Sequence, residues 1–149
     1  MAHLVDTSIL SRLANAADAW FGIASRAVAE LHRRGEILHI TPQNLVEFRN
    51  MATRPAANNG LGLPAVDAEA KATIFEATFP LLVETPAIYP TWKALVQAVG
   101  VTGKQVHDAR LAAICHVYGV THVLTFNVGH FNRLAMFGPG ITVVDPATV

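Results

Sequence analysis

Short apolar runs alternate with longer stretches of helical periodicity along the whole chain. The runs are bounded by polar or turn-forming residues, which is typical of short buried strands. They cover Ala2–Val5, Ile37–Ile40, Leu81–Glu84, His122–Thr125 and Ile141–Val144. Strands that alternate with helices predict a parallel sheet with helices on both faces. We therefore expect an α/β fold, a three-layer α/β/α sandwich around a central parallel sheet of four or five strands.

Apolar residues at intervals of three and four predict the helices between these strands. The expected helices span Ser8–Asn15, Trp20–Arg34, Pro42–Arg54, Val66–Phe79, Pro90–Val99, Val106–Tyr118 and Phe131–Met136. Thr41-Pro42 marks one helix start, with threonine as N-cap and proline in the first turn. In the helix after Pro64 we expect Ala70, Ile74 and Ala77 to form the buried stripe. In the helix ending at Tyr118 that side chain is expected on the core face.

The composition narrows the class of protein. The 149 residues suit a single domain spanning 1–149, and 52% of them are hydrophobic while only 15% are charged. So few charges favour a chain that buries surface against a partner or a second copy of itself. A net formal charge of zero argues against nonspecific binding of duplex nucleic acid.

The cysteine content and the apolar runs bear on location. A single cysteine, Cys115, allows no intrachain disulfide and fits the reducing cytosol, so we expect a cytoplasmic protein. No apolar run reaches the roughly 18 residues of a membrane helix. The first residues lack a basic segment and look like a strand, not a signal peptide.

Four polar residues of metal-binding type follow the predicted strands. Asp6 closes the first strand, Glu47 lies one turn into the helix after the second, Asp108 opens a helix, and Asn127 follows the fourth strand. The carboxyl ends of parallel strands share one edge, where ligands bind, so these side chains should converge. Clustered carboxylates repel one another unless a cation joins them, and oxygen ligands suit Mg²⁺ or Mn²⁺. The pattern indicates metal-assisted phosphodiester hydrolysis.

Three of these residues also have an ordinary structural interpretation. Asp6 can be a helix N-cap, Asp108 can favour the positive end of a helix dipole, and Asn127 can be a turn residue. Ser8 can bond to the Asp6 carboxylate or a metal-bound water, or it can cap a helix. What favours a site is that independent caps need not fall on one edge of the sheet.

Glu47 is the most informative of the set. It lies among apolar neighbours, where a carboxylate is costly without a partner. The structural alternative is an ion pair with Arg49 or Arg110. These two residues are also among the cations near the proposed edge that could receive phosphates, namely Arg12, Arg49, Arg54, Lys104 and Arg110.

Other chemistries lack their sequence signals. His116 and His130 have no partner at zinc-ligand spacing, and His107 should point away from Asp108 on a helix. No nucleophile elbow and no phosphate-binding glycine loop of the Walker type occurs. Cys115 lies on an apolar helix face and is expected in the core.

Four segments, in order along nearly the whole chain, resemble the PIN-domain ribonucleases, in particular the VapC-type toxins of toxin–antitoxin pairs. The segments are Asp6-Thr7-Ser8, Leu45–Phe48 around Glu47, His107–Ala113 around Asp108, and Leu124–Asn127 before His130-Phe131. The resemblance implies a PIN-like α/β/α fold and endonucleolytic cleavage of RNA that depends on Mg²⁺ or Mn²⁺.

The resemblance also implies a role for each site residue. Asp6, Glu47 and Asp108 match the family's acidic positions and would hold the metal ion, which activates water for in-line attack. Ser8 and Asn127 would position water or the phosphate. Family members usually carry a fourth acid where this chain has Asn127, which leaves open whether one or two ions bind.

The same resemblance implies two protein partners, a second copy of the chain in a homodimer and a small antitoxin that covers the site. Two alternatives remain. A phosphatase of the haloacid dehalogenase type also begins with a strand ending in Asp, but it needs a second Asp where this chain has Ser8. A catalytically weakened PIN module that binds RNA or a protein is the other, supported by Asn127 alone.

Overall fold

Four parallel strands form the centre of the molecule in the order β2-β1-β3-β4. The computed structural model describes residues 1–136 and 140–149. The strands are β1 (Ala2–Val5), β2 (Ile37–His39), β3 (His122–Leu124) and β4 (Thr142–Val144). In register, Leu4 of β1 lies between His39 of β2 and Val123 of β3. The predicted α/β class with a central parallel sheet is therefore confirmed.

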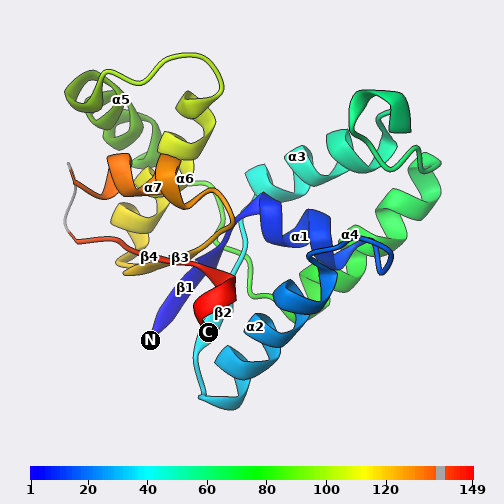
Figure 1. Cartoon of the computed structure of the whole chain (residues 1–149). Coiled ribbons are helices and arrows are strands. Elements are labelled where there is room, and N and C mark those ends of the chain that lie inside the picture. The colour runs from blue at the N-terminus through cyan, green and yellow to red at the C-terminus, as the bar shows by residue number, and fades with distance from the viewer. Residues whose placement is uncertain (137–139) are drawn as a thin grey trace.

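Helices cover both faces of this sheet (Figure 1). They are α1 (Thr7–Leu13), α2 (Phe21–Arg33), α3 (Pro42–Thr53), α4 (Ala65–Thr78), α5 (Ile88–Val99), α6 (Gln105–Tyr118) and α7 (Val128–Ala135), with short 3-10 turns at Ala56–Asn58 and Pro146–Thr148. One core lies between the sheet and α1 to α4, and a second lies between the sheet and α5 to α7. In the part of the chain that the structure describes, no helix has the length and apolar character needed to cross a membrane.

Three local predictions were wrong, namely those for the segment Leu81–Glu84, for Tyr118 and for the buried face of α4. The segment Leu81–Glu84 is not a strand, because only Leu81 meets the sheet, through a single bridge to Ile40. Tyr118 is 36% exposed, and its hydroxyl donates to the Val83 carbonyl oxygen at 2.7 Å. The chain leaves the sheet after one bridge, and although Leu82 is buried, Val83 and Glu84 lie at the surface.

The helix α4 buries the opposite stripe from the one predicted. Ala68, Ala72 and Phe75 pack into the core, whereas Ile74 is 62% exposed. The predicted partners of Ile74, which are Ala70 and Ala77, are exposed as well. Both stripes are apolar, so the periodicity finds the helix but does not select the buried face.

Candidate active site at the carboxyl edge of the sheet

Asp6 leaves β1 at the carboxyl edge of the sheet and is only 2% exposed. Its Oδ2 accepts hydrogen bonds from Ser8 Oγ at 2.6 Å and from Thr125 Oγ1 at 2.7 Å. The Ser8 amide is more distant at 3.4 Å, so the N-cap contact expected of Asp6 is present but long. Every side-chain bond recorded for Asp6 among the described residues uses Oδ2. One carboxylate oxygen is therefore fixed, and the other accepts no hydrogen bond from the described residues.

Glu47 is positioned by the way α3 begins. Thr41 and Asn44 form the expected cap at the helix start, each bonding the other's backbone amide. Asn44 Nδ2 also donates to Thr7 Oγ1 at 3.1 Å, and Thr7 Oγ1 in turn donates to Glu47 Oε2 at 2.7 Å. Gln43, one turn earlier on α3, donates to Glu47 Oε1 at 2.7 Å. Both carboxylate oxygens are thus oriented by neutral donors.

The ion-pair explanation of Glu47 does not hold. Arg49 contacts Glu69 at 2.6 Å, and Arg110 contacts Glu84 at 2.6 Å. Within residues 1–136 and 140–149 no salt bridge to Glu47 is found. Its charge is therefore left uncompensated by the protein, although a carboxylate in this half-buried position favours a cation.

Asp108 lies in the first turn of α6, which begins at Gln105 and not at Asp108 itself. Its Oδ2 is 3.2 Å from His130 Nδ1 of α7. The Asp108 side chain is 19% exposed and His130 is 53% exposed, so this pair faces the solvent side of the edge. His130, which had been set aside as a zinc ligand, is instead the neighbour of an acidic site residue.

Asn127 occupies the turn between β3 and α7. Its backbone amide donates to Thr125 Oγ1 at 2.9 Å, and its side chain makes no capping bond to α7. The side-chain Nδ2 lies 3.4 Å from Asp6 Oδ2. The turn position accounts for the backbone, but the amide group is turned toward Asp6.

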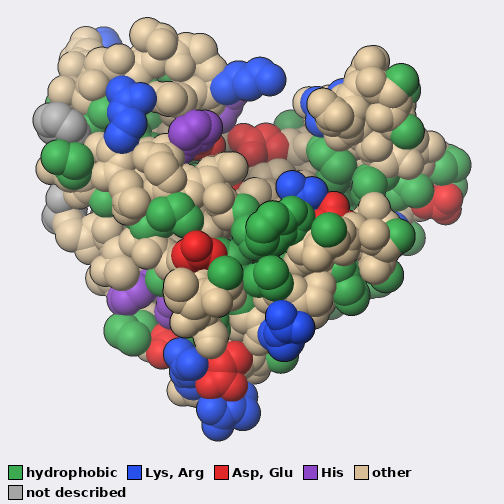
Figure 2. All heavy atoms as spheres, in the orientation of Figure 1, with side chains coloured by type: hydrophobic (Ala, Val, Ile, Leu, Met, Phe, Trp, Pro, Cys, Tyr) green, Lys and Arg blue, Asp and Glu red, His purple; other side chains and the backbone are tan. Residues whose placement is uncertain are grey.

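Glu47, Asp108 and Asn127 border a groove of about 550 Å³ between α3 on one side and the start of α6 with α7 on the other, while Asp6 lies buried beside Asn127. One wall is lined by Val46, Glu47 and Asn50 of α3 and by Arg54 just after it, and the other by Lys104, His107 and Asp108 at the start of α6. Asn127 and His130 complete the wall. Figure 2 shows this cleft at the top of the molecule, with acidic side chains at its floor and basic ones on both lobes.

Comparison with known proteins identifies the family. The model of the PIN domain matches residues 3–136. The chain belongs to the PIN domain family. No curated protein matches the sequence significantly.

Solved structures with the same fold cover almost all of this PIN domain. VapBC2 from Rickettsia felis, bound to a DNA fragment from its promoter, is 14% identical with a TM-score of 0.69, over 97% of this chain and 100% of that chain. VapC20 of Mycobacterium tuberculosis, described as a toxin that cleaves the sarcin-ricin loop, is 23% identical with a TM-score of 0.62, over 87% and 93%. VapBC-1 from nontypeable Haemophilus influenzae is 16% identical with a TM-score of 0.66, over 98% of both chains. These likenesses establish a shared fold.

The acidic side chains of this PIN domain influence one another electrostatically. Burial raises the pKa of Asp6, against the opposing effect of its hydrogen bonds to Ser8 and Thr125. Burial and then the Asp6 charge raise the pKa of Asp108 to about 6, with Glu47 adding to the rise and His130 opposing it. Ionising Asp6 and Asp108 together is thus unfavourable, and a bound cation would relieve that cost.

The donor set fits a hard divalent cation, although the carboxylates are not drawn together around one point. Among the described residues, no three His, Cys, Asp or Glu side chains gather closely enough to hold an ion between them. Thr7 of α1 and Gln43 of α3 hold Glu47, and His130 holds Asp108. Mutual repulsion favours this separation, because each acid takes a nearby neutral or basic partner instead.

Four contact residues of the site were not predicted, namely Thr7, Gln43, Thr125 and His130. Each supports an acid that was predicted, through a hydrogen bond of 2.7 to 3.2 Å. A signal existed for Gln43, because it lies four residues before Glu47 and shares its helix face. The other contacts join elements that are remote in sequence, so no local sequence pattern predicts them.

Proposed function

We propose that this chain is a metal-dependent endoribonuclease, the toxin of a toxin–antitoxin pair. The observation that carries the proposal is the set of three acids at one sheet edge, none of which pairs with an Arg or Lys among the described residues. A structural role would be better served by compensating those charges. Membership of the PIN domain family supports the same function, as does the fold shared with VapC20, a toxin that cleaves the sarcin-ricin loop.

In this proposal Asp6, Asp108 and Glu47 hold Mg²⁺ or Mn²⁺. The ion would supply the positive charge that makes water a nucleophile and that stabilises the charge developing on the phosphate. Ser8 and Thr125 keep Asp6 in one orientation, with Oδ1 turned free of their donors. Thr7 and Gln43 do the same for Glu47.

Asn127 and His130 take roles beside the acids. The Asn127 amide lies next to Asp6 and is assigned to hold water or a phosphate oxygen. It brings no charge, so the site holds one dominant ion more readily than two. His130 contacts Asp108 and faces the groove, where a ring N–H can donate to a leaving or bridging oxygen.

The protein partners belong to the same proposal. A small antitoxin would cover the groove, and a second copy of the chain would form a homodimer. The low charged fraction of 15% suits both contacts, because interfaces of this kind exclude charged residues from their centre. Expression of the chain alone should arrest growth of a bacterial host, and Asp6→Asn should relieve the arrest at equal protein level. Arrest that persists in Asp6→Asn would separate toxicity from the proposed site.

Cleavage of RNA by purified protein tests the enzymatic part. A labelled single-stranded RNA should be cut internally in Mg²⁺ or Mn²⁺ by wild type and by Asp67→Asn, an exposed acid of α4. Asp6→Asn should lose the cleavage while keeping its circular dichroism spectrum. Equal cleavage by Asp6→Asn would overturn the assignment of the site.

A further inference from the structure

We propose that Arg54 and Lys104 bind substrate phosphates on opposite walls of the acidic groove, an inference that rests on the proposed function. Both residues line the groove that also contains Glu47 and Asp108. The acidic side chains of the groove repel the negatively charged backbone of RNA, so RNA can enter the groove only if positive charge lies beside them. Arg54 and Lys104 supply one such charge from each wall.

The other basic residues near this edge have acidic partners. These pairs are Arg12 with Asp18 at 2.7 Å, Arg49 with Glu69 at 2.6 Å, and Arg110 with Glu84 at 2.6 Å. Arg54 and Lys104 have no such partner within the described residues. Of the five cations that the sequence brings near the site, these two keep their charge available to a ligand.

Arg54 is held in place by the loop that follows α3. The Arg54 carbonyl oxygen accepts a hydrogen bond from the Gly62 amide at 2.8 Å, and its guanidinium donates to the Asn59 carbonyl oxygen at 3.3 Å. Gly60 packs so closely that a Cβ there would lie 1.8 Å from the Arg54 carbonyl oxygen. The buried Nε of Arg54 has no hydrogen-bond partner in the part of the chain that the structure describes. The loop therefore holds a cation that lines the groove.

The spacing along α3 sets what Arg54 can reach. Val46, Asn50 and Arg54 recur every four residues and all line the groove, so they form one stripe of the helix beside Glu47. Glu47 and Arg54 are separated by roughly 10 Å along the helix axis, at 1.5 Å per residue. Arg54 thus contacts a phosphate that neighbours the scissile one, and its loss should affect binding more than the chemical step.

Lys104 approaches from the opposite wall. It stands at the N-cap position of α6, four residues before Asp108, and its side chain makes no capping bond. Lys104 lines the same groove as Asp108, the acid that the proposal assigns to the metal. A strand of RNA that crosses the groove would meet Lys104 on one flank and Arg54 on the other, through its backbone and independently of base sequence.

Salt dependence of binding tests the proposal directly. Binding of a fluorescent single-stranded RNA is measured by anisotropy in the Asp108→Asn background, which silences cleavage in every variant alike. Each lost phosphate contact should lower the slope of log K against log salt by about 0.7. The loss of RNA affinity caused by Arg54→Gln or Lys104→Gln should therefore shrink about fivefold for a tenfold rise in salt.

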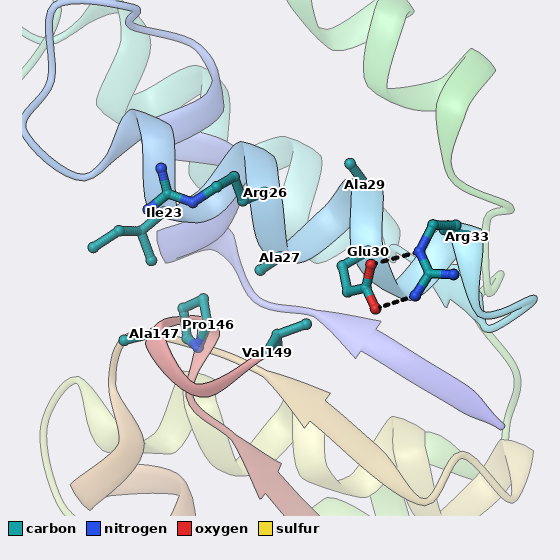
Figure 3. Close-up of a pocket in the computed structure, with 9 residues that line it drawn as sticks. All are labelled: Ile23, Arg26, Ala27, Ala29, Glu30, Arg33, Pro146, Ala147 and Val149. Atoms are coloured by element: carbon teal, nitrogen blue, oxygen red, sulfur yellow. Dashed lines mark hydrogen bonds and ion pairs between the residues drawn. The ribbon is translucent and has the colours of Figure 1, made fainter.

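Arg26→Gln is the matched control. Arg26 lies on α2 at the hollow between that helix and the C-terminal 3-10 turn, which shares no lining residue with the groove (Figure 3). The slope of log K against log salt for Arg26→Gln should equal that of the Asp108→Asn protein from which it is made. Arg54→Lys keeps the charge and should keep the slope. If Arg54→Gln unfolds because the loop depends on it, Lys104→Gln decides the question, since Lys104 belongs to the start of α6 and not to that loop.

The outcomes separate this inference from the proposed function. Unchanged slopes in both glutamine variants would overturn the phosphate contacts, even if the protein cleaves RNA. Lowered slopes in a protein that never cleaves RNA would uphold the contacts while the nuclease proposal fails. In the active background, Arg54→Gln should raise KM several-fold with kcat nearly unchanged, and a loss confined to kcat would contradict the assigned position.

Discussion

Replacing Asp108 with asparagine should stabilise the metal-free protein. The ordinary pKa of 3.8 is raised to about 6 in the folded chain, by burial first and by the Asp6 charge second. Ionised Asp108 is therefore a cost to folding at neutral pH. Asparagine has nearly the same shape and carries no charge, so Asp108→Asn removes that cost.

The magnitude follows from the pKa change. With the Asp108 side chain 19% exposed, a rise to about 6 corresponds to at most about 3 kcal/mol at pH 7.5. The variant loses about 0.3–1 kcal/mol of favourable interaction with the start of α6. It also loses the exposed contact with His130, worth about 1 kcal/mol or less. We expect a net gain of about 1–2 kcal/mol, and about 2–4 °C in Tm for each kcal/mol.

The pH dependence gives the prediction its sign. Between pH 4 and about 6 the folded protein binds a proton at Asp108 that the unfolded chain has released. Wild-type stability should therefore fall as pH rises through this window and then level off. The advantage of Asp108→Asn should be small near pH 4 and complete above about pH 6.5.

Urea unfolding in EDTA at pH 4.5 and pH 7.5 measures both effects, with Asp67→Asn as control. Asp67 is also a first-turn acid, on α4, but it is exposed and its variant should lose up to about 1 kcal/mol. Adding Mn²⁺ at 100 times its Kd should stabilise wild type by about 2.7 kcal/mol and the Asp108 variant far less. If Asp108→Asn is instead the less stable protein at pH 7.5, Asp108 is a structural residue of the helix start.

Three further predictions concern the other members of the site. Asn127→Asp should tighten Mn²⁺ binding in a calorimetric titration because it adds a carboxylate beside Asp6, and unchanged affinity would mean that residue 127 points away from the ion. RNA cleavage should decline as pH falls through about 6, where Asp108 takes up a proton, and a pH–rate profile that stays flat down to pH 5 would contradict its role. Thr7→Val should cost about 1 kcal/mol of stability and weaken Mn²⁺ binding by releasing Glu47, so an unaltered Mn²⁺ affinity would remove Thr7 from the site.

Much of the fold follows from local signals in the sequence. Thr41-Pro42 predicts the start of α3, and the observed helix has that cap and that first-turn proline. The face of α4 could not be predicted, since Ile74 and Phe75 belong to rival apolar stripes and only packing selects Phe75. Leu81–Glu84 has the composition of a strand, but pairing with a partner decides strand formation, and only Leu81 finds one.

For the candidate site, the position of each acid along the chain could be predicted, but the orientation of its side chain could not. Because parallel strands end at one edge, the chain positions of Asp6, Glu47 and Asp108 suffice to predict that they approach each other. Their hydrogen bonds could not be predicted, because Thr125, which directly follows β3, reaches Asp6 from 119 residues away in sequence. Which cations are free is also a tertiary property, as the pairing of Arg110 with Glu84 shows.

Cleavage of a labelled RNA by purified chain, first in EDTA and then after Mn²⁺ is restored, tests the central claim most directly. The account predicts no cleavage in EDTA and internal cleavage after Mn²⁺ is added back. The Glu47→Gln variant should not cleave under either condition, although it should still bind RNA through Arg54. Cleavage that continues in EDTA, or at wild-type rate in Glu47→Gln, would contradict a metal-dependent site at this edge of the sheet.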